Sequence, residues 1–182
     1  RKSGVLEYVP NRVALDELGG LANLKQWLLQ RERFFGKQAA EFGISAPKGL
    51  LVTGISGCGK SLCVQAIAAA WRLPMVRLDM NKVYAAALGS PEATLETAIR
   101  TAEQVSPCVL WIDEIEKGFA QDTEGRAIRV LGSLLTWLQE KAAPVFLVAT
   151  ANQVDRLPPE LLRKGRFDEI FFVDLPDIHD RG

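Results

Sequence analysis

The stretch GISGCGKS, from Gly54 to Ser61, combines the residue types that bind phosphate. It fits the pattern Gly-x-x-x-x-Gly-Lys-Ser and follows the apolar run GLLVT. Its glycines let the backbone curl with its N–H groups inward, and the N-terminus of a following helix attracts anions. Lys60 can reach the outer phosphates of a nucleotide, and the Ser61 hydroxyl can bind Mg²⁺. The alternative, a glycine-rich turn without a ligand, is disfavoured by the flanking strand and helix.

A pair of carboxylates, Asp113 and Glu114, ends the apolar run CVLWI. Ending a buried strand on two acids is costly unless something cationic lies there, and Mg²⁺ with a triphosphate would supply it. Asp113 would then hold the metal through water, and Glu114 would polarise an attacking water. The alternative is a solvated strand end.

Further polar residues follow the next apolar strand. Asn152, at the end of ATAN, has a donor and an acceptor and could orient a water against the γ-phosphate. Arg163 and Arg166, in LLRKGRFD, carry guanidinium groups suited to transition-state charge on a phosphoryl group. If they serve a neighbouring subunit, hydrolysis requires an oligomer. The alternatives are an ordinary turn Asn and a solvated Arg face.

Apolar runs alternate with helical patterns along the chain, which predicts a three-layer α/β fold with a five-stranded parallel sheet covered by helices on both faces. Ligands of such sheets bind at the carboxyl ends of the strands, where all the residues above fall. Strands are predicted at 49–54, 75–80, 108–113, 144–151 and 169–175. Helices are predicted from 21, over 34–42, 60–71, 91–105 and 126–141, and in PPELLRKG, closed by Gly165; residues 1–20 are predicted to be irregular.

The composition fits one globular domain and excludes several classes of function. The chain has 182 residues, 48 % of them hydrophobic, with 22 basic and 22 acidic side chains. This balance does not indicate nucleic-acid binding, and no apolar run approaches the ~20 residues that span a bilayer. Three scattered Cys and one His argue against a disulfide framework or a zinc site. A reducing compartment such as the cytoplasm is expected from this cysteine pattern.

These motifs, in this order, resemble those of the AAA+ ATPases, from about Leu15 to Pro176. GISGCGKS is similar to the Walker A motif, VLWIDE to Walker B, ATAN to sensor 1, and LPPELLRKGRFD to the arginine-finger segment of the AAA branch. LTWLQE, PVFLVATAN and LLRKGRFDEIFFVDLP resemble a group recorded as a hypothetical reading frame in plastid and cyanobacterial genomes.

The resemblance implies a P-loop NTPase that binds ATP and Mg²⁺, assembles with itself into a hexamer, and remodels or regulates a protein client. Residues 1–182 would be the large nucleotide-binding subdomain of a longer chain, because the family continues into a helical lid. LDELGGLANLKQWL resembles the family's lead-in beside the adenine. The implied nucleotide contacts are Leu18, Gly19, Gly20, Gly54, Ser56, Gly57, Cys58, Gly59, Lys60, Ser61 and Leu62, and the implied metal ligands are Ser61 and Asp113.

One departure from the family concerns threading of a peptide. In YAAALGSPE, Gly89 is in register with the family's pore loop, but Ala87 and Leu88 stand where an aromatic pair is usual. Tyr84 lies several residues too early, and Leu grips a peptide less well than an aromatic ring. His179 has no ligand partner nearby in the sequence and is expected on the surface.

Three other functions compete with ATP hydrolysis. A nucleotide-switched scaffold with negligible turnover is favoured by the weak pore loop and disfavoured by Glu114, Asn152 and the Arg pair. A small-molecule kinase would need an Arg-rich lid that the sequence lacks. A GTPase would need an Asn-Lys-x-Asp motif, of which ANQVD is only a loose echo.

Overall fold

The computed structural model describes residues 4–10, 22–31, 41, 47–54, 59–85, 90–119, 125–140, 143–163 and 167–173. They form a six-stranded sheet in the order β1-β3-β4-β5-β2-β6. The strands are β1 (Leu6–Val9), β2 (Gly49–Gly54), β3 (Met75–Leu78), β4 (Cys108–Ile112), β5 (Val145–Ala151) and β6 (Glu169–Val173). All pairs are parallel except the antiparallel pair β1–β3.

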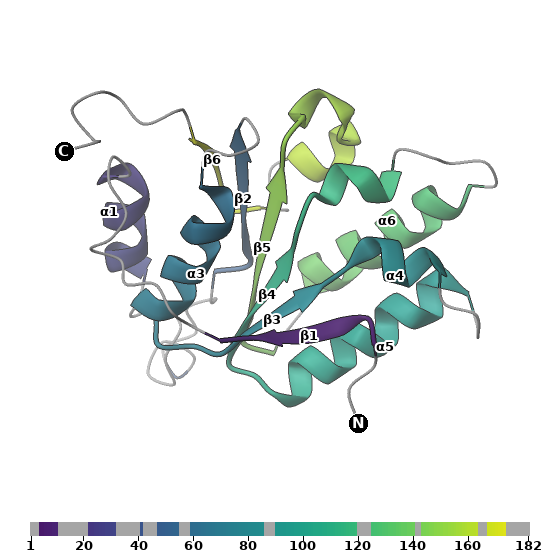
Figure 1. Cartoon of the computed structure of the whole chain (residues 1–182), viewed down its shortest axis with the longest axis horizontal. Coiled ribbons are helices and arrows are strands. Elements are labelled where there is room, and N and C mark those ends of the chain that lie inside the picture. Colours follow the sequence, from purple (N-terminus) through teal and green to yellow (C-terminus); the bar gives the residue numbers. More distant parts are fainter. Residues whose placement is uncertain are drawn as a thin grey trace.

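Helices cover both faces of this sheet (Figure 1). The α-helices are α1 (Ala22–Arg31), α3 (Lys60–Ala70), α4 (Met80–Ala85), α5 (Pro91–Gln104) and α6 (Arg126–Glu140). Three short 3₁₀ helices are η3 (Ile115–Phe119), η4 (Val154–Arg156) and η5 (Pro159–Leu162). The predicted three-layer α/β architecture is confirmed, but the sheet has six strands, one of them antiparallel, rather than the five parallel strands predicted.

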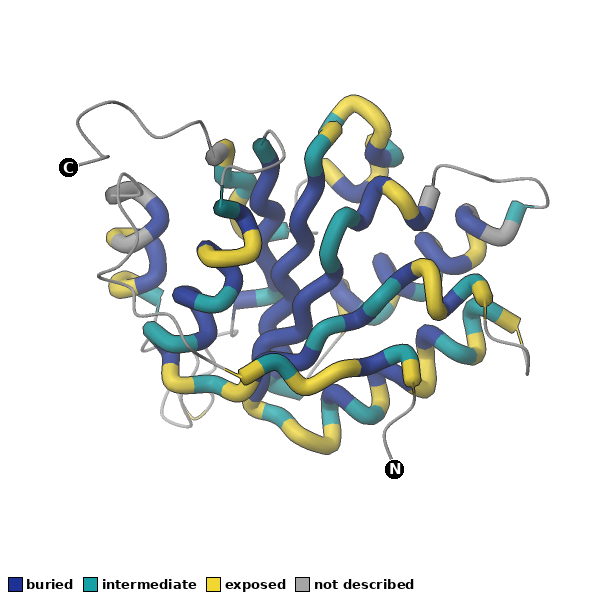
Figure 2. The backbone as a smooth tube through the Cα atoms, viewed as in Figure 1, coloured by how far each residue is buried: buried dark blue, intermediate teal, exposed yellow. Residues whose placement is uncertain are grey.

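Two hydrophobic cores lie on the two faces of the sheet, because successive strand residues point to opposite sides. On β4, Val109 and Trp111 pack with α1 and α3, whereas Leu110 and Ile112 pack with α4, α5 and α6. The central strands are buried along their length (Figure 2). This alternation also assigns a face to the polar residues that follow each strand, since Asp113 continues the series of Val109 and Trp111.

An aromatic cluster fixes α1 against the sheet. The Trp27 ring centroid lies 6.2 Å from that of Trp71 and 6.0 Å from that of Phe146. Trp71 and Phe146 meet edge to face at 4.6 Å, an arrangement that aromatic pairs prefer. The Trp71 indole N–H donates to the Leu28 carbonyl over 3.0 Å, so its polar atom is satisfied although it is buried.

Most predicted elements are confirmed, with one strand shorter than expected. The strand predicted over 75–80 ends at Leu78, and Met80 begins α4 instead. Asp79 explains the difference, because its side chain accepts the Asn81 N–H over 3.0 Å and so acts as a helix N-cap. Ser90 caps α5 in the same way, with Pro91 in the first turn as expected.

The prediction that residues 1–20 are irregular is wrong for Leu6–Val9, which form β1. Leu6 faces Leu78 and Val9 faces Met75 across an antiparallel pair at the sheet edge. Only Leu6 of this strand is buried, so its alternation was too weak to predict a strand. Residues 11–20, Gly165, His179 and the helix predicted over 34–42, apart from the helical Glu41, lie outside the described residues.

The chain approaching β6 is clamped onto the start of β2. Asp168 Oδ2 accepts the backbone N–H groups of Lys48 and Gly49 over 2.6 and 2.7 Å. The Asp168 N–H donates to the Gly49 carbonyl over 2.8 Å. A Cβ at Gly49 would lie 2.8 Å from the Leu147 carbonyl oxygen and 3.3 Å from Phe167 Cδ1. Only glycine fits where these three segments meet.

We therefore expect Gly49→Ala to reduce the free energy of unfolding by about 1–3 kcal/mol, because the added methyl group meets backbone that cannot move away. The matched control is Gly132→Ala in α6, where a Cβ meets nothing within 4 Å. That change should be neutral or stabilise by up to about 1 kcal/mol through helix propensity. Urea denaturation of both variants is the measurement, and equal effects would refute the account of Gly49.

Candidate active site

The described part of the phosphate loop brings Gly54 and the start of α3 together. Gly54 ends β2, and Gly59, in the left-handed conformation with φ 82°, is the N-cap of α3. A side chain at Gly59 would be strained in that conformation. Ser61 and Leu62 are exposed at the N-terminus of α3. Ser56, Gly57 and Cys58 lie outside the described residues.

Lys60 lies back against the strand that precedes it. Its side chain is buried, and its ammonium group donates to the Gly54 carbonyl over 3.1 Å. This contact spans the loop and places the cation between the end of β2 and the first turn of α3. The positive charge is therefore held at the N-terminus of α3, next to the end of β2.

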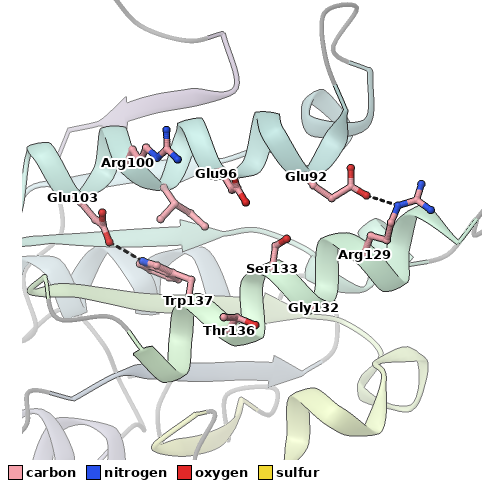
Figure 3. A pocket seen from close by; sticks show the side chains of 10 residues that line it. Glu92, Glu96, Arg100, Glu103, Arg129, Gly132, Ser133, Thr136 and Trp137 are labelled. Carbon is pink, nitrogen blue, oxygen red and sulfur yellow. Dashed lines mark hydrogen bonds and ion pairs between the residues drawn. The ribbon is translucent and has the colours of Figure 1, made fainter.

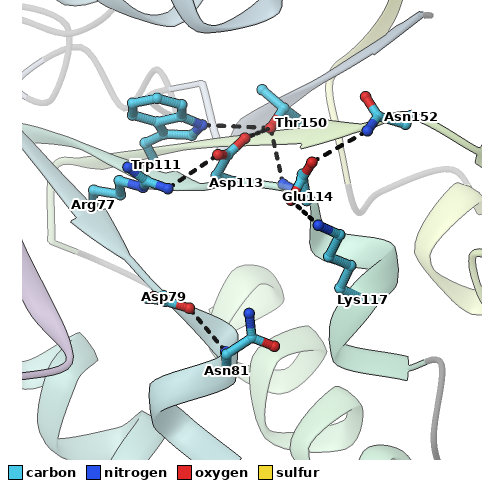
Figure 4. A network of polar contacts seen from close by, with 9 residues as sticks. All are labelled: Arg77, Asp79, Asn81, Trp111, Asp113, Glu114, Lys117, Thr150 and Asn152. Carbon is cyan, nitrogen blue, oxygen red and sulfur yellow. Dashed lines mark hydrogen bonds and ion pairs between the residues drawn. The ribbon is translucent and has the colours of Figure 1, made fainter. Parts of the chain in front are cut away.

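Thr150 on β5 joins the carboxyl ends of β4 and β5 (Figure 4). Its buried hydroxyl donates to Asp113 Oδ1 over 2.7 Å and accepts the Glu114 backbone N–H over 3.1 Å. The Trp111 indole N–H makes a longer contact of 3.5 Å with the same oxygen. One donor and two acceptor sites are all that a hydroxyl offers, so Thr150 is satisfied, and it fixes one carboxylate oxygen of Asp113.

Glu114 leaves the strand in an unusual backbone conformation. Its φ is 49°, in the left-handed region that few residues other than glycine adopt. The chain bends there, and the Glu114 carboxylate lies next to the Asn152 side chain, whose Nδ2 donates to Oε1 over 3.3 Å. Strained backbone of this kind clusters at functional sites. The structure thus brings Asp113, Glu114 and Asn152 together as predicted.

Lys117 forms an ion pair with the second carboxylate oxygen of Glu114. Its Nζ lies 2.5 Å from Glu114 Oε2 within the turn that continues into η3. The hydrogen bond to Glu114 raises the pKa of Lys117, so the ammonium form is favoured further. Both oxygens of the Glu114 carboxylate therefore have a partner in this conformation.

Glu116 holds the backbone of Asn152 in place through a hydrogen bond. It is only 6 % exposed, and its Oε1 accepts the Asn152 backbone N–H over 3.1 Å. Its second oxygen is buried and has no hydrogen-bond partner among the described residues. Buried polar groups without a partner are costly, so the hydrogen bond to the residue that follows β5 offsets only part of the cost of burying this carboxylate.

Arg77, on the neighbouring strand β3, pairs with the second oxygen of Asp113. Its Nη2 lies 3.2 Å from Asp113 Oδ2, and its guanidinium carbon lies 5.1 Å from the centroid of the Trp111 ring. Asp113 therefore has a buried hydroxyl on one oxygen and a cation on the other.

Arg163 is exposed beyond η5, and it is not part of this network among the described residues. Arg166 and the predicted adenine contacts Leu18, Gly19 and Gly20 lie outside the described residues. The predicted roles of these residues stay predictions.

One hollow in the described structure lies beside the predicted site residues, and a second lies away from them. A small cavity of about 70 Å³ lies between the ends of β3 and β4, with Asp113, Glu114 and Lys117 on its wall. It has room for about two water molecules. A larger groove of about 650 Å³ lies between α5 and α6, bordered by the pairs Glu92–Arg129 and Glu103–Trp137 (Figure 3). None of the predicted site residues lines that groove.

The oxygen atoms offered by Asp113 after β4 and by Ser61 in the first turn of α3 fit Mg²⁺, which binds oxygen and keeps several of its waters. Ser61 offers an exposed hydroxyl, and the Asp113 side chain is 25 % exposed. No cluster of three or more His, Cys, Asp or Glu suited to a metal occurs in the described ranges.

The cysteines that are described do not belong to the site. Burial raises the pKa of the Cys63 and Cys108 thiols to about 11, so both stay protonated and unreactive near neutral pH. No helix in the part of the chain that is described combines the length and apolar character needed to cross a bilayer.

Sequence analysis missed Thr150, Arg77, Glu116 and Lys117. Thr150 lies on β5 two residues before Asn152, which directly follows the end of that strand. Arg77 is a charged residue within the otherwise apolar strand MVRL, which indicates a partner nearby. Lys117 lies three residues after Glu114, a spacing that brings side chains together in a helical turn. Glu116 gave no such signal.

Thr150→Val removes the hydroxyl while keeping the shape of the side chain. We expect it to reduce the free energy of unfolding by about 1–3 kcal/mol, because Asp113 and the Glu114 N–H lose their buried partner. Thr150→Ser keeps the hydroxyl and should retain more of the stability. Urea denaturation compares the three proteins. A Val variant as stable as the wild type would show that the hydroxyl does not organise the strand ends.

The comparisons with known proteins agree with this geometry. The model of the ATPase family associated with various cellular activities (AAA) matches residues 50–175. The chain is 51 % identical, over 97 % of its length and 37 % of the relative's, to "Uncharacterized AAA domain-containing protein ycf46" of Pyropia yezoensis. Proteins with the same name are 50 % identical in Gracilaria tenuistipitata var. liui, over 99 % of this chain and 38 % of the relative, and 49 % identical in Guillardia theta, over 97 % and 36 %.

The chain thus spans a little over a third of the length of these relatives. Its fold is that of a P-loop NTPase, and family membership supports nucleotide binding and hydrolysis in general. The resemblance inferred from the sequence motifs is confirmed: the chain belongs to the AAA family of ATPases.

Proposed function

We propose that this chain hydrolyses the β–γ phosphoanhydride bond of Mg²⁺-bound ATP and uses the reaction to remodel or regulate a protein partner. The observation that carries the proposal is the hydrogen-bonded group of Asp113, Glu114, Thr150 and Asn152 at adjacent strand ends. A carboxylate that can accept a proton and an amide that can orient a water lie side by side there.

The phosphate loop would bind the triphosphate. Gly59 and the N-terminus of α3 present backbone N–H groups and the positive end of a helix dipole. Lys60 would exchange its contact with the Gly54 carbonyl for the outer phosphates. Ser56, Gly57 and Cys58 would complete the cradle, Leu62 would lie beside it, and Leu18, Gly19 and Gly20 would contact the adenine.

Ser61 and Asp113 would hold the metal, which when bound neutralises charge on the phosphate oxygens. Thr150 keeps Asp113 Oδ1 in place, so this carboxylate is oriented before any ligand arrives. Arg77 contacts the other oxygen from β3. Residues from three strands therefore determine where the metal-binding oxygen points.

Glu114 would act as the general base. Water attacks the γ-phosphorus, its proton passes to the Glu114 carboxylate, and the bond to the β–γ bridging oxygen breaks to give ADP and phosphate. Asn152 would orient the water, and the cavity of about 70 Å³ beside Glu114 has space for it. Glu116 holds the backbone of Asn152 and so positions its amide.

One observation favours a second function, an ATP-switched scaffold or regulator with negligible turnover. Lys117 and Asn152 together engage both oxygens of Glu114. A base held in this way accepts a proton poorly, and hydrolysis requires Lys117 to release it. The pair is exposed to solvent on the Lys117 side, with 55 % of that side chain accessible, which makes release inexpensive. We therefore keep hydrolysis as the main proposal.

The partner residues of the site would come from a second copy of the chain. Arg163 is exposed and makes no contact with Glu114 among the described residues, so within one subunit it is free to act elsewhere. We propose that Arg163 and Arg166 reach the γ-phosphate of a neighbouring subunit in a hexamer. The protein client stays undefined, and the cytoplasm or plastid stroma is the proposed location.

Glu114→Gln should abolish steady-state ATP hydrolysis, with a loss of about 100-fold or more, because the amide cannot accept the proton. Binding of a non-hydrolysable ATP analogue should persist, since Glu114 is not a phosphate ligand. Glu96→Gln, an equally conservative change on the exposed face of α5, is the control and should leave both properties unchanged. Undiminished phosphate release by Glu114→Gln would remove Glu114 from the role of base.

A further inference from the structure

We propose that Arg77 is a positioning residue that acts as the resident counter-ion of Asp113, so that this carboxylate binds a divalent cation weakly until a nucleotide brings one. The inference rests on the proposed function, in which Asp113 is a metal ligand. Its starting point is Arg77, a charged and half-buried side chain in the otherwise buried apolar strand MVRL.

The sheet register places Arg77 where it can reach Asp113. Arg77 lies directly opposite Trp111 in the parallel pair β3–β4. Its guanidinium group lies over the Trp111 ring at 5.1 Å and extends to Asp113 Oδ2 at 3.2 Å. Asp113 is two residues beyond Trp111, so all three side chains share the α3 face of the sheet.

The two oxygens of Asp113 are held unequally. Oδ1 accepts from the fully buried Thr150 hydroxyl, a contact that nothing in solution can replace easily. Oδ2 is paired with Arg77, whose side chain is 39 % exposed. Exposed ion pairs are weak and exchange readily. The oxygen that faces Arg77 is therefore the one that can change partner.

One hydrogen-bond donor of Arg77 also lacks a partner among the described residues. Its Nε is buried and has no hydrogen-bond partner in the described part of the chain. The cavity of about 70 Å³ that borders both Arg77 and Asp113 gives the guanidinium group space to shift. Asp113 and Trp111 thus hold Arg77 in a position that it can leave when Asp113 takes a stronger partner.

The consequence concerns cation binding without nucleotide. A positive charge 3.2 Å from Oδ2 opposes the approach of a second cation to the same carboxylate. The negative charge of a triphosphate would offset this opposition, so the metal would be held with nucleotide and only weakly alone. Arg77 would in this way make metal binding at Asp113 depend on ATP.

The test uses Arg77→Met, which keeps an unbranched apolar stem for Trp111 and removes the charge. Thermal unfolding of the nucleotide-free protein is followed against MgCl₂ concentration at constant ionic strength. We expect the Mg²⁺ concentration that gives half of the stabilisation to fall about three- to tenfold relative to wild type. In the Asp113→Asn background, Arg77→Met should produce no such shift.

Lys82→Met is the control for net charge, because Lys82 is an exposed cation on α4 that does not line the cavity. Arg77→Gln replaces Arg77→Met if the latter does not fold. An unchanged Mg²⁺ midpoint, an equal shift in Lys82→Met, or a shift that persists without Asp113 would each overturn the proposal. Binding of an ATP analogue by the wild type, measured with and without Mg²⁺, tests the proposed function separately, since the unfolding series contains no nucleotide.

Discussion

The site depends on one buried hydroxyl, that of Thr150. It donates to Asp113 and accepts from the Glu114 backbone, and so ties the end of β4 to β5. Without it, Asp113 Oδ1 and the Glu114 backbone N–H would lose their buried partner, which is an unfavourable arrangement. With it, Asp113 is fixed in direction, and the left-handed turn at Glu114 places the second carboxylate beside Asn152. The sheet supplies the rest, because parallel strands deliver these residues to one edge.

Much of the fold could be predicted because buried parallel strands and their helices have clear patterns. The strand GLLVTG and the helix after Gly59 lie where the apolar pattern of the sequence predicted them. The edge strand Leu6–Val9 could not be predicted, since a strand with only one buried side chain has little apolar alternation. Asp79 ended the strand before Met80 through a side-chain cap, and such local hydrogen bonds compete with strand pairing without changing apolar periodicity.

The motif residues of the candidate site could be predicted from the sequence, whereas the residues that support them could not. Asp113, Glu114 and Asn152 belong to motifs whose residue types and spacing indicate a chemical role. Arg77 and Thr150 act through other side chains, and their meaning depends on which strands are neighbours. The strand order places β4 between β3 and β5, so both residues reach Asp113 from opposite sides. The carboxylates that line the cavity, those of Asp79, Asp113 and Glu114, each have a hydrogen-bond or ion-pair partner among the described residues. Under the proposed function, nucleotide binding would exchange some of these internal partners.

We propose that this arrangement hydrolyses ATP rather than only binding it, and that a neighbouring copy completes the site. Phosphate release from Mg²⁺-ATP, measured against protein concentration, tests both parts at once. We expect turnover whose rate per subunit rises as the protein assembles. Saturable ATP binding with no phosphate release at any protein concentration would contradict it and would identify the chain as a nucleotide-switched scaffold.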